Sequence, residues 1–288
     1  MRIEMRGIDK SFGSNQVLKQ AGFTLESGEV HALMGENGAG KSTLMKILTG
    51  VYTKDAGTVL VDGKEVNYKN PQEAEKAGIV FIYQELNVMF DLTVEENLFM
   101  GKEIHGKFGI CDKKAMQKKA QEALNILGVN ISPKTVMAEL SVGQQQMVEI
   151  CKALMADAKV IIMDEPTTAL TENEVDQLYR IIETVKARGI AIIFISHKLD
   201  EVFRVSDEIT VIRDGQYVDT KPTKEVTKEQ LISMMVGRDM SEMFQRERFE
   251  LSDEIVLEIK HFTREGKYQD INFAVRKGEI FGIAGLVG

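Results

Sequence analysis

The sequence of 288 residues has no tryptophan, four prolines and two cysteines. Cys111 and Cys151 are too few for a disulfide framework, and neither lies in a CxxC motif or a Cys/His cluster, so a reducing compartment fits. No apolar run approaches the ~18 residues of a membrane-spanning helix, and the N-terminal MRIEMRGIDK lacks the apolar segment of a signal peptide. We therefore expect a folded protein that stays in the cytosol.

Positive charge is also in short supply, because 36 Lys and Arg face 44 Asp and Glu, a net charge of −8. A dedicated DNA or RNA binder needs a basic surface, so only a local patch would allow nucleic acid as a partner. The hydrophobic share of 43% and charged share of 28% are ordinary for globular proteins. The length suits roughly two domains at ~150 residues each, although one larger domain is compatible with it.

An internal repeat organises the chain. The segment GFTLESGEVHALMGENG at 22–38 matches NFAVRKGEIFGIAGLVG at 272–288 at a constant offset of 250. We expect one complete domain over 1–238, a charged and Met-rich linker over 239–253, and the opening strands of a second copy over 254–288. Among the residues that recur in the second copy are Gly28, Glu29, Gly35 and Gly38.

Short apolar runs alternate with helical stretches through the first copy. The runs are Val30–Met34, Ile79–Tyr83, Val160–Met163, Ala191–Ile195 and Ile209–Ile212. Continuous apolar strands between helices predict an α/β fold with a mostly parallel sheet covered on both faces. The Asp62-Gly63 pair within Thr58–Val66 instead predicts a hairpin, and hence an antiparallel part near the N-terminus.

Residues from about 93 to 156 lack strand-like runs, which predicts an inserted α-helical subdomain. One helix is expected in Met116–Leu127, where a stripe of apolar residues repeats at helical spacing. That stripe consists of Ala120, Ala123, Leu124 and Leu127.

A glycine-rich loop, GENGAGKS at Gly35–Ser42, matches the pattern GxxxxGK[ST]. It follows the Val30–Met34 run and opens a helical pattern over Thr43–Leu48, which disfavours a chance glycine turn. Backbone N–H groups of such a loop surround phosphate oxygens, and the helix N-terminus adds partial positive charge. Lys41 would reach the β and γ phosphates, and Ser42 would ligate Mg²⁺. The candidate nucleotide-binding residues are Gly35, Glu36, Asn37, Gly38, Ala39, Gly40, Lys41, Ser42 and Thr43.

Two acids end the apolar run VIIMDE at Val160–Glu165. Asp164 at the strand tip can reach a magnesium ion beside Ser42, and Glu165 points to where an attacking water would lie. An acid at this position is as often just the start of a helix. The phosphate loop in the same chain favours the catalytic interpretation.

Five motifs in chain order resemble those of ATP-binding cassette ATPases. They are the phosphate loop, Gln84 after a strand, LSVGQQQ at Leu140–Gln146, VIIMDE, and His197 after AIIFIS. The LSVGQ segment is the most specific of them. The resemblance covers residues 1 to about 250 and resumes to 288. It implies a P-loop NTPase fold with a mostly parallel sheet, an antiparallel N-terminal β part and an inserted α-helical subdomain.

The resemblance implies roles for individual residues. Phe12 would stack on adenine, Gln84 would contact Mg²⁺ or water and relay the nucleotide state to a transmembrane partner, and His197 would contact the γ-phosphate. Taken without the other motifs, Gln84 is a polar strand-end residue and His197 a surface residue. The catalytic set implied is Glu165, His197 and Gln84, and the Mg²⁺ ligands implied are Ser42, Gln84 and Asp164.

The LSVGQ segment is implied to act in trans, on ATP held by an opposing cassette. Ser141, Gly143 and Gln144 lie at a helix start and would present donors to the γ-phosphate. Two departures from the commoner family pattern occur, since Val142 replaces a glycine and TTALT stands where many cassettes have SALD. The first leaves the phosphate donors in place, whereas the second leaves the contacts of Thr168–Thr171 across the interface open.

Together with the second copy, these motifs resemble the ATPase subunits of bacterial monosaccharide importers of the ribose, galactose and xylose group. That implies an ATP-hydrolysing subunit at the cytoplasmic face of the membrane, pairing its own two cassettes. Its partners would be a membrane permease and, through it, an extracytoplasmic sugar-binding protein. A soluble paired-cassette ATPase of translation or DNA repair would be expected to carry a long basic linker. A regulatory module without turnover is the third possibility, and Glu165 argues against it.

We expect Lys41→Ala to abolish most ATP binding, because the lysine supplies the one side-chain cation that complements the triphosphate in the loop. Titration calorimetry with Mg·ATP measures this directly. Equal affinity in the wild type and in Lys41→Ala would remove the assignment of the site.

Overall fold

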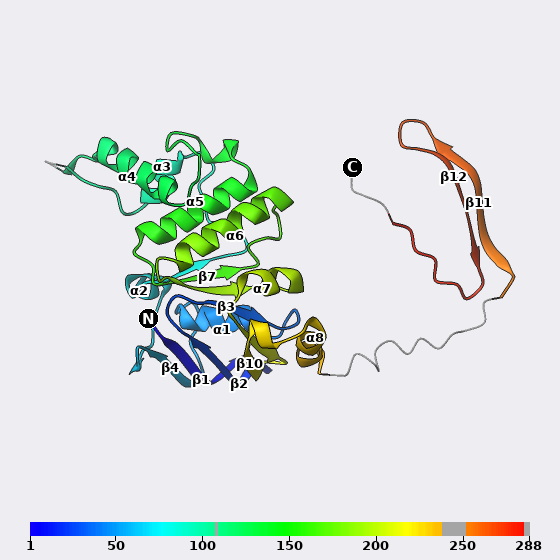
Figure 1. The fold of residues 1–288 in the computed structure, drawn as a ribbon, viewed down its shortest axis with the longest axis horizontal. Coiled ribbons are helices and arrows are strands. Elements are labelled where there is room, and N and C mark those ends of the chain that lie inside the picture. The colour runs from blue at the N-terminus through cyan, green and yellow to red at the C-terminus, as the bar shows by residue number, and fades with distance from the viewer. Residues whose placement is uncertain (107–108, 238–251, 285–288) are drawn as a thin grey trace. The chain divides into compact units, whose positions relative to one another are not determined.

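The apolar runs of the sequence form five strands of a six-stranded sheet in the order β10-β9-β3-β8-β7-β6. Of this sheet, β3, β7 and β10 are labelled in Figure 1. The pairs β9–β3, β3–β8, β8–β7 and β7–β6 are parallel, and β10 is antiparallel. The computed structural model describes residues 1–106, 109–237 and 252–284. The strands are β3 (Val30–Met34), β6 (Ile79–Ile82), β7 (Val160–Asp164), β8 (Ala191–Ile195), β9 (Glu208–Arg213) and β10 (Gln216–Pro222). The mostly parallel sheet predicted from the sequence is confirmed.

A second sheet, in the order β2-β1-β4-β5, is entirely antiparallel. Asp62 and Gly63 join β4 to β5 with φ values of 49° and 74°, the left-handed conformation that tight hairpin turns require. This confirms the antiparallel part predicted near the N-terminus. Its strands are β1 (Ile3–Phe12), β2 (Asn15–Leu25), β4 (Ala56–Val61) and β5 (Lys64–Glu65).

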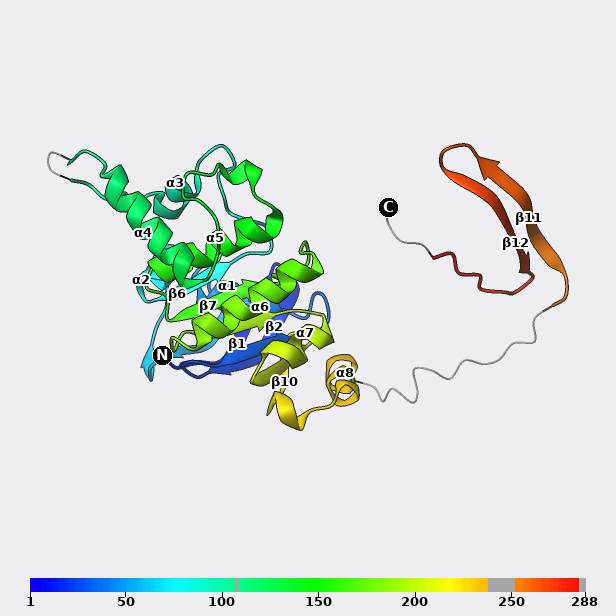
Figure 2. The ribbon, with the colours of Figure 1, turned by 45° about the horizontal axis from the view of Figure 1, so that its top comes forward.

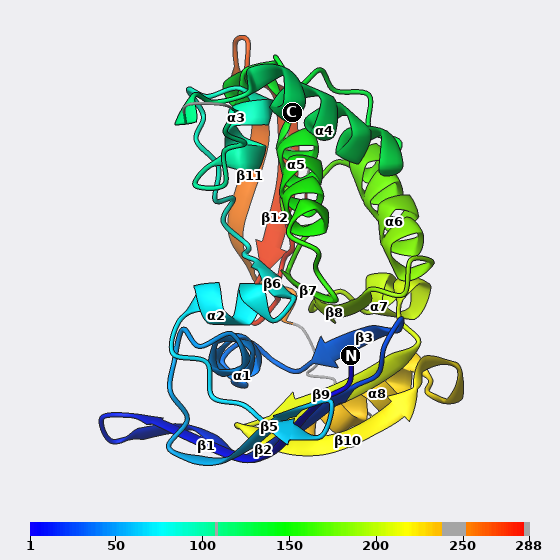
Figure 3. The same cartoon turned by 90° about the vertical axis from the view of Figure 1, so that its left-hand side faces the viewer.

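Helix α1 (Lys41–Leu48) packs between the two sheets and is seen end-on in Figure 3. Its Leu44 shares one hydrophobic cluster with Phe23 of β2 and Ile162 of β7. The helix begins two residues before the predicted start, because Gly40 with φ 99° turns the chain directly into it.

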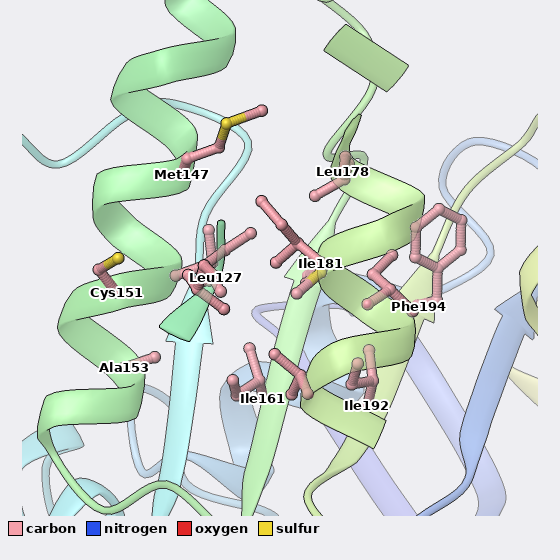
Figure 4. Packing of buried hydrophobic residues seen from close by; sticks show 14 of the residues in the cluster. Leu127, Met147, Cys151, Ala153, Ile161, Leu178, Ile181, Ile192 and Phe194 are labelled. Carbon is pink, nitrogen blue, oxygen red and sulfur yellow. The ribbon is translucent and has the colours of Figure 1, made fainter. Parts of the chain in front are cut away.

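The other face of the six-stranded sheet is covered by α5 (Val142–Met155) and α6 (Glu172–Lys186). Side chains alternate along β7, so that Ile161 joins the cluster beneath α5 and α6, whereas Ile162 joins the cluster around α1. Figure 4 shows Met147 of α5 and Ile181 of α6 above this face of the sheet. Burial on both faces explains why these strands are continuously apolar.

In the described part of residues 93–156, the α-helices gather at one end of this unit (Figure 2). They are α3 (Val94–Phe99), α4 (Lys113–Ile126) and α5. The predicted apolar stripe at 120, 123, 124 and 127 is buried, with exposures of at most 6%, as expected for a helix face turned to the core. The remaining helices are α2 (Pro71–Lys76), α7 (Leu199–Val205), α8 (Lys228–Val236) and the short 3₁₀ segments Met137–Glu139 and Thr223–Glu225.

The chain divides into two units, Met1–Met240 and Ser241–Gly288, and the second holds the hairpin β11 (Ile255–Arg264) and β12 (Tyr268–Arg276). The turn after β12 repeats the turn after β2. Glu29 accepts a bond from the N–H of Glu26 at 2.8 Å, and Glu279 accepts one from the N–H of Arg276 at 2.8 Å. The division at 238 and 253 stays a prediction. Most of the predicted linker (239–253) lies outside the described residues, because these exclude 238–251, and so does the end of the repeat (285–288).

In the part of the chain that the structure describes, no helix is both long enough and apolar enough to span a lipid bilayer.

A cavity of about 230 Å³ lies between α2, β6 and α5. Glu149 of α5 lines it with Asn87 and Tyr83, and is 8% exposed. Burial raises the pKa of the Glu149 carboxyl, and the backbone N–H of Asn87 partly offsets this by donating a hydrogen bond. An ionised Glu149 in the folded state therefore lowers stability at neutral pH.

We expect Glu149→Gln to raise the melting temperature at about pH 7, because the amide keeps the size and an acceptor but carries no buried charge. The raised pKa means that the folded state holds the proton more tightly than the unfolded state does. The gain should be full above the folded pKa and vanish as the pH falls towards the ordinary glutamate value of about 4.3. Calorimetry of both proteins across this range measures it, and a gap that widens in acid would contradict the assignment.

Candidate active site

The carboxyl ends of β3, β8 and β7 meet at one edge of the sheet, because these three strands are parallel neighbours. The predicted phosphate loop leaves β3, the Asp164–Glu165 pair ends β7, and His197 follows β8 by two residues. Gln84 follows the next strand, β6, also by two residues. Parallel pairing thus brings four separate sequence motifs to one edge.

Glycines shape the loop that follows β3 because a side chain has no room at either end. A Cβ on Gly35 would lie 2.1 Å from the carbonyl oxygen of Ile212. A Cβ on Gly40 would lie 2.6 Å from Leu18 Cδ2, and its φ of 99° favours glycine. Between them Glu36, Asn37 and Gly38 are exposed, whereas Ala39 and Gly40 are buried.

Lys41 turns back into its own loop and is only 7% exposed. Its Nζ donates to the carbonyl oxygens of Gly35 at 2.9 Å and Glu36 at 3.0 Å. Burial lowers the pKa of Lys41, and the nearby carboxylates of Glu165 and Asp164 oppose this shift. The loop therefore holds a desolvated ammonium group beside two acids, an arrangement suited to anionic oxygens.

Asp164 accepts a hydrogen bond from the hydroxyl of Ser42, in the first turn of α1. Burial raises the pKa of Asp164, and the charge of Glu165 adds to this, so the carboxylate favours a nearby cation. Among the described residues no group of three or more His, Cys, Asp or Glu could hold a metal. Mg²⁺ is usually held by one or two carboxylates together with substrate phosphates and water, so the Ser42–Asp164 pair fits such an ion.

Glu165 is the meeting point of the predicted catalytic residues. Its Oε1 lies 3.0 Å from Nδ1 of His197, and its Oε2 accepts a bond from Nε2 of Gln84 at 3.4 Å. The hydroxyl of Thr168 donates to Oε2 at 3.3 Å. The backbone of Glu165 adopts φ 47°, the left-handed region, and its N–H donates to the carbonyl of Ile195 at 2.9 Å. Such strained positions are concentrated at functional sites.

Glu201 was not among the site residues predicted from the sequence. It lies in the first turn of α7 and is 8% exposed. Its Oε1 accepts the hydroxyl of Thr167 at 2.6 Å, and its Oε2 accepts the hydroxyl of Ser196 at 3.0 Å. Lys198 Nζ lies 3.1 Å from Oε1. Because Thr167 is two residues after Glu165 and Ser196 is next to His197, this carboxylate joins the two segments that carry them. The only signal in the sequence is an acid at a helix start, which ordinarily indicates a cap.

The LSVGQ segment forms the N-terminus of α5. Ser141 caps the helix, since it accepts the N–H of Gln144 at 3.2 Å and its own N–H donates to Gln144 Oε1 at 3.0 Å. Its hydroxyl donates to Glu174 Oε1 at 2.6 Å. Among the hydrogen bonds of the described residues, none joins Ser141, Gly143 or Gln144 to residues 35–43. The structure does not bring this segment to the loop of its own chain.

Phe12 lies at the end of β1, in the antiparallel sheet, and is 44% exposed. Its ring packs edge-on against Tyr52 at 5.1 Å between centroids, with Lys10 Nζ 5.3 Å from its centroid. An exposed ring face is suited to stacking, and its contact with adenine stays a prediction.

A family model described as ABC transporter matches residues 18–168. The chain is 51% identical over 289 residues to a "Ribose import ATP-binding protein RbsA" of Bacillus cereus (strain ZK / E33L) and 53% identical over 288 residues to that of Lactococcus lactis subsp. lactis. These alignments cover the whole chain but 58% of each relative. The chain is also similar to the solved "ADP conformation of MJ1267, an ATP-binding cassette of an ABC transporter". That similarity has a TM-score of 0.71 and 29% identity, and it covers 85% of this chain and 98% of the other.

We expect Thr167→Val to lower the turnover of ATP by about tenfold with ATP affinity within about twofold, because small displacements of catalytic groups are costly whereas the phosphate loop is untouched. The valine has the shape of threonine but lacks the hydroxyl that donates to Glu201. Thr167→Ser, which keeps the hydroxyl, is the matched control. A loss of affinity without loss of turnover, measured by steady-state kinetics and calorimetry, would refute a role in positioning Glu165.

Proposed function

The chain belongs to the ABC transporter family, and from that we propose that it is an ATP-binding and ATP-hydrolysing subunit that powers import of a monosaccharide of the ribose, galactose or xylose class through a separate membrane permease. The observation that carries the proposal is the meeting of Glu165, His197 and Gln84 beside the loop that holds Lys41. The ribose-import names of relatives near 50% identity favour the sugar class.

ATP binds at the loop of residues 35–43 in this proposal. Lys41 exchanges its two backbone carbonyl partners for oxygens of the β and γ phosphates, a favourable exchange because the ammonium group is already desolvated. The exposed residues Glu36, Asn37 and Gly38 present backbone N–H groups, and Thr43 adds a hydroxyl in the first turn of α1. Phe12 stacks on the adenine.

Ser42, Asp164 and Gln84 hold Mg²⁺ in the proposed site. The ion supplies charge neutralisation at the β and γ phosphates when it is bound. Asp164 provides the carboxylate. Burial raises its pKa, and the charge of Glu165 adds to this, whereas Ser42, Lys46 and Lys41 oppose the shift. Gln84 is bonded to Glu165, so it can exchange that partner for the ion or its water.

Glu165 orients and activates the attacking water. His197 holds the Glu165 carboxylate in position and contacts the γ-phosphate. The 3.0 Å contact between Nδ1 of His197 and Oε1 of Glu165 fixes the two side chains relative to each other. Glu201 accepts hydrogen bonds from Thr167 and Ser196 and so helps to position the neighbouring residues Glu165 and His197. These residues act on water and phosphate only, which is sufficient for hydrolysis of a phosphoanhydride.

A complete site requires a second cassette. In the proposal, Ser141, Gly143 and Gln144 donate to the γ-phosphate of ATP that the opposing cassette holds, and the natural partner is the chain's own second cassette. Residues 254–288 are its opening strands, 1–238 the first cassette and 239–253 the linker. The apolar residues Ile255, Leu257 and Phe262 of the hairpin are about half exposed here, as expected for strands whose core lies in further sequence. Residues 1–288 alone are then mostly monomeric, with low basal turnover.

The permease contacts the helical part next to Gln84. The cavity lined by Glu149, Asn87 and Tyr83 lies where the segment after Gln84 meets α5, so a loop seated there can sense the position of Gln84. Through the permease the subunit serves an extracytoplasmic sugar-binding protein, and it works at the cytoplasmic face of the membrane. A soluble paired-cassette ATPase of translation or DNA repair is the less favoured alternative, because the net charge of −8 argues against nucleic acid.

Reconstitution tests the proposal. The full-length two-cassette protein is combined in vesicles with candidate permeases and sugar-binding proteins, and ATP turnover is measured with each monosaccharide. We expect stimulation by one member of the ribose, galactose and xylose class. Glu165→Gln in the same vesicles should bind ATP and show turnover reduced by about 10²–10⁴-fold.

Stimulation by ribosomes, lipid or peptide but by no monosaccharide system would overturn the transport class while leaving the nucleotide site intact. Near-normal turnover in Glu165→Gln would overturn the catalytic role of Glu165.

A further inference from the structure

The carboxylate of Glu174 lies against the N-terminus of α5. Its Oε1 accepts the Ser141 hydroxyl at 2.6 Å, and the backbone N–H of Gly143 also donates to the carboxylate. The contact is close, since a Cβ on Gly143 would come within 2.5 Å of the Glu174 Cδ. These are two of the donors that the proposed function gives to a γ-phosphate from the opposing cassette.

Glu174 is ionised in this position. The Ser141 hydroxyl and then the backbone N–H of Thr171 hold the pKa of the Glu174 carboxyl below its usual value. Negative charge at a helix N-terminus is favourable because the first N–H groups of the helix have no partner within it. The start of α5 therefore already binds an anion, and that anion comes from the same chain.

The two carboxylate oxygens have different partners. Oε2 accepts the N–H of Thr171 at 3.0 Å and its hydroxyl at 2.9 Å, which completes the capping box of α6. Oε1 reaches across to Ser141, 33 residues earlier in the sequence. Helices α5 and α6 lie side by side (Figure 1), so this short contact joins their N-termini. The bond to Ser141 can break while the cap of α6 stays.

Ser141 cannot serve two anions. A serine hydroxyl has a single hydrogen, so its bond to Glu174 and a bond to a phosphate oxygen exclude one another. A phosphate that binds the N–H of Gly143 would also lie close to the negative charge of Glu174, and the two like charges would repel each other. One of the two anions has to leave.

We propose that Glu174 is an internal competitor of ATP at the LSVGQ segment: it occupies the donors of Ser141 and Gly143 until the γ-phosphate of an opposing cassette displaces it. The proposal rests on the proposed function, specifically on the in-trans role of this segment. Glu174 thereby opposes premature closure of two cassettes, because each closure must first break its bond to Ser141. The apparent affinity of a site falls by the fraction of time that a competitor fills it.

The test is ATP-dependent association of two copies of residues 1–288, both carrying Glu165→Gln so that ATP is consumed only slowly. Sedimentation velocity over a titration of Mg·ATP gives the half-saturating concentration. Glu174→Gln keeps an oxygen that can cap α6 but removes the charge, and we expect it to lower that concentration by about 3–30-fold. Glu174→Asp, whose carboxylate is one methylene too short to reach Ser141, should shift it in the same direction. Thermal melting verifies that each variant folds.

Two controls separate competition from general charge or structural effects. Glu172→Gln removes an exposed charge from the same first turn of α6 and should leave the titration within about twofold. Ser141→Ala removes the contested donor, so adding Glu174→Gln to it should give no gain. A gain that persists without Ser141 would overturn the proposal, because the two anions would then not compete for that hydroxyl.

The proposal is overturned if Glu174→Gln associates no more readily than its parent, including the case in which no variant associates. Calorimetric titration of the same proteins with Mg·ATP distinguishes this outcome from a failure of the proposed function. Normal Mg·ATP binding with no gain in association rejects the role of Glu174 alone. Absence of ATP binding in the parent protein rejects the nucleotide site itself.

Discussion

The parallel pairing of β3, β8 and β7 is the constraint on which the site depends. Side chains of β7 and β8 alternate between the cluster around α1 and the cluster beneath α5 and α6, so both faces of these strands are held. The strands cannot shift by one residue without exchanging the two sets of side chains. Because their register is fixed, Asp164, Glu165 and His197 emerge at fixed heights beside the loop of Lys41. Hydrophobic packing thus determines the separation of charged groups that make no hydrophobic contacts themselves.

Features that depend on local sequence were predictable from it. The turn at Asp62–Gly63 needs two left-handed residues, and that pair is among the few that supply them. The buried strands follow from runs of apolar residues too short for helices, and the buried stripe of α4 follows from helical periodicity. The predicted start of α1 was two residues too late. Gly40 precedes the first helical residue, but from the sequence alone it cannot be distinguished from the other glycines of the loop.

Features that depend on partners distant in sequence were not predictable. Glu201 and Glu174 are both acids in the first turn of a helix, where an acid usually serves as a cap. Their second role depends on which loop lies opposite. The bond from Thr167 to Glu201 spans 34 residues and the bond from Ser141 to Glu174 spans 33. Such contacts cannot be predicted from the local sequence, because they depend on which loops the folded sheet brings together.

The left-handed backbone of Glu165 has a consequence for any attempt to make this protein more robust. Glycine would relax the torsion at that position, and asparagine would tolerate it better than glutamate does. Either exchange would favour the folded state locally and remove the carboxylate that joins His197 and Gln84. Under the catalytic role proposed for Glu165, a search for thermostable variants that scores only folding would therefore select against turnover. At this position the protein retains a strained backbone, which lowers local stability, in order to keep the carboxylate.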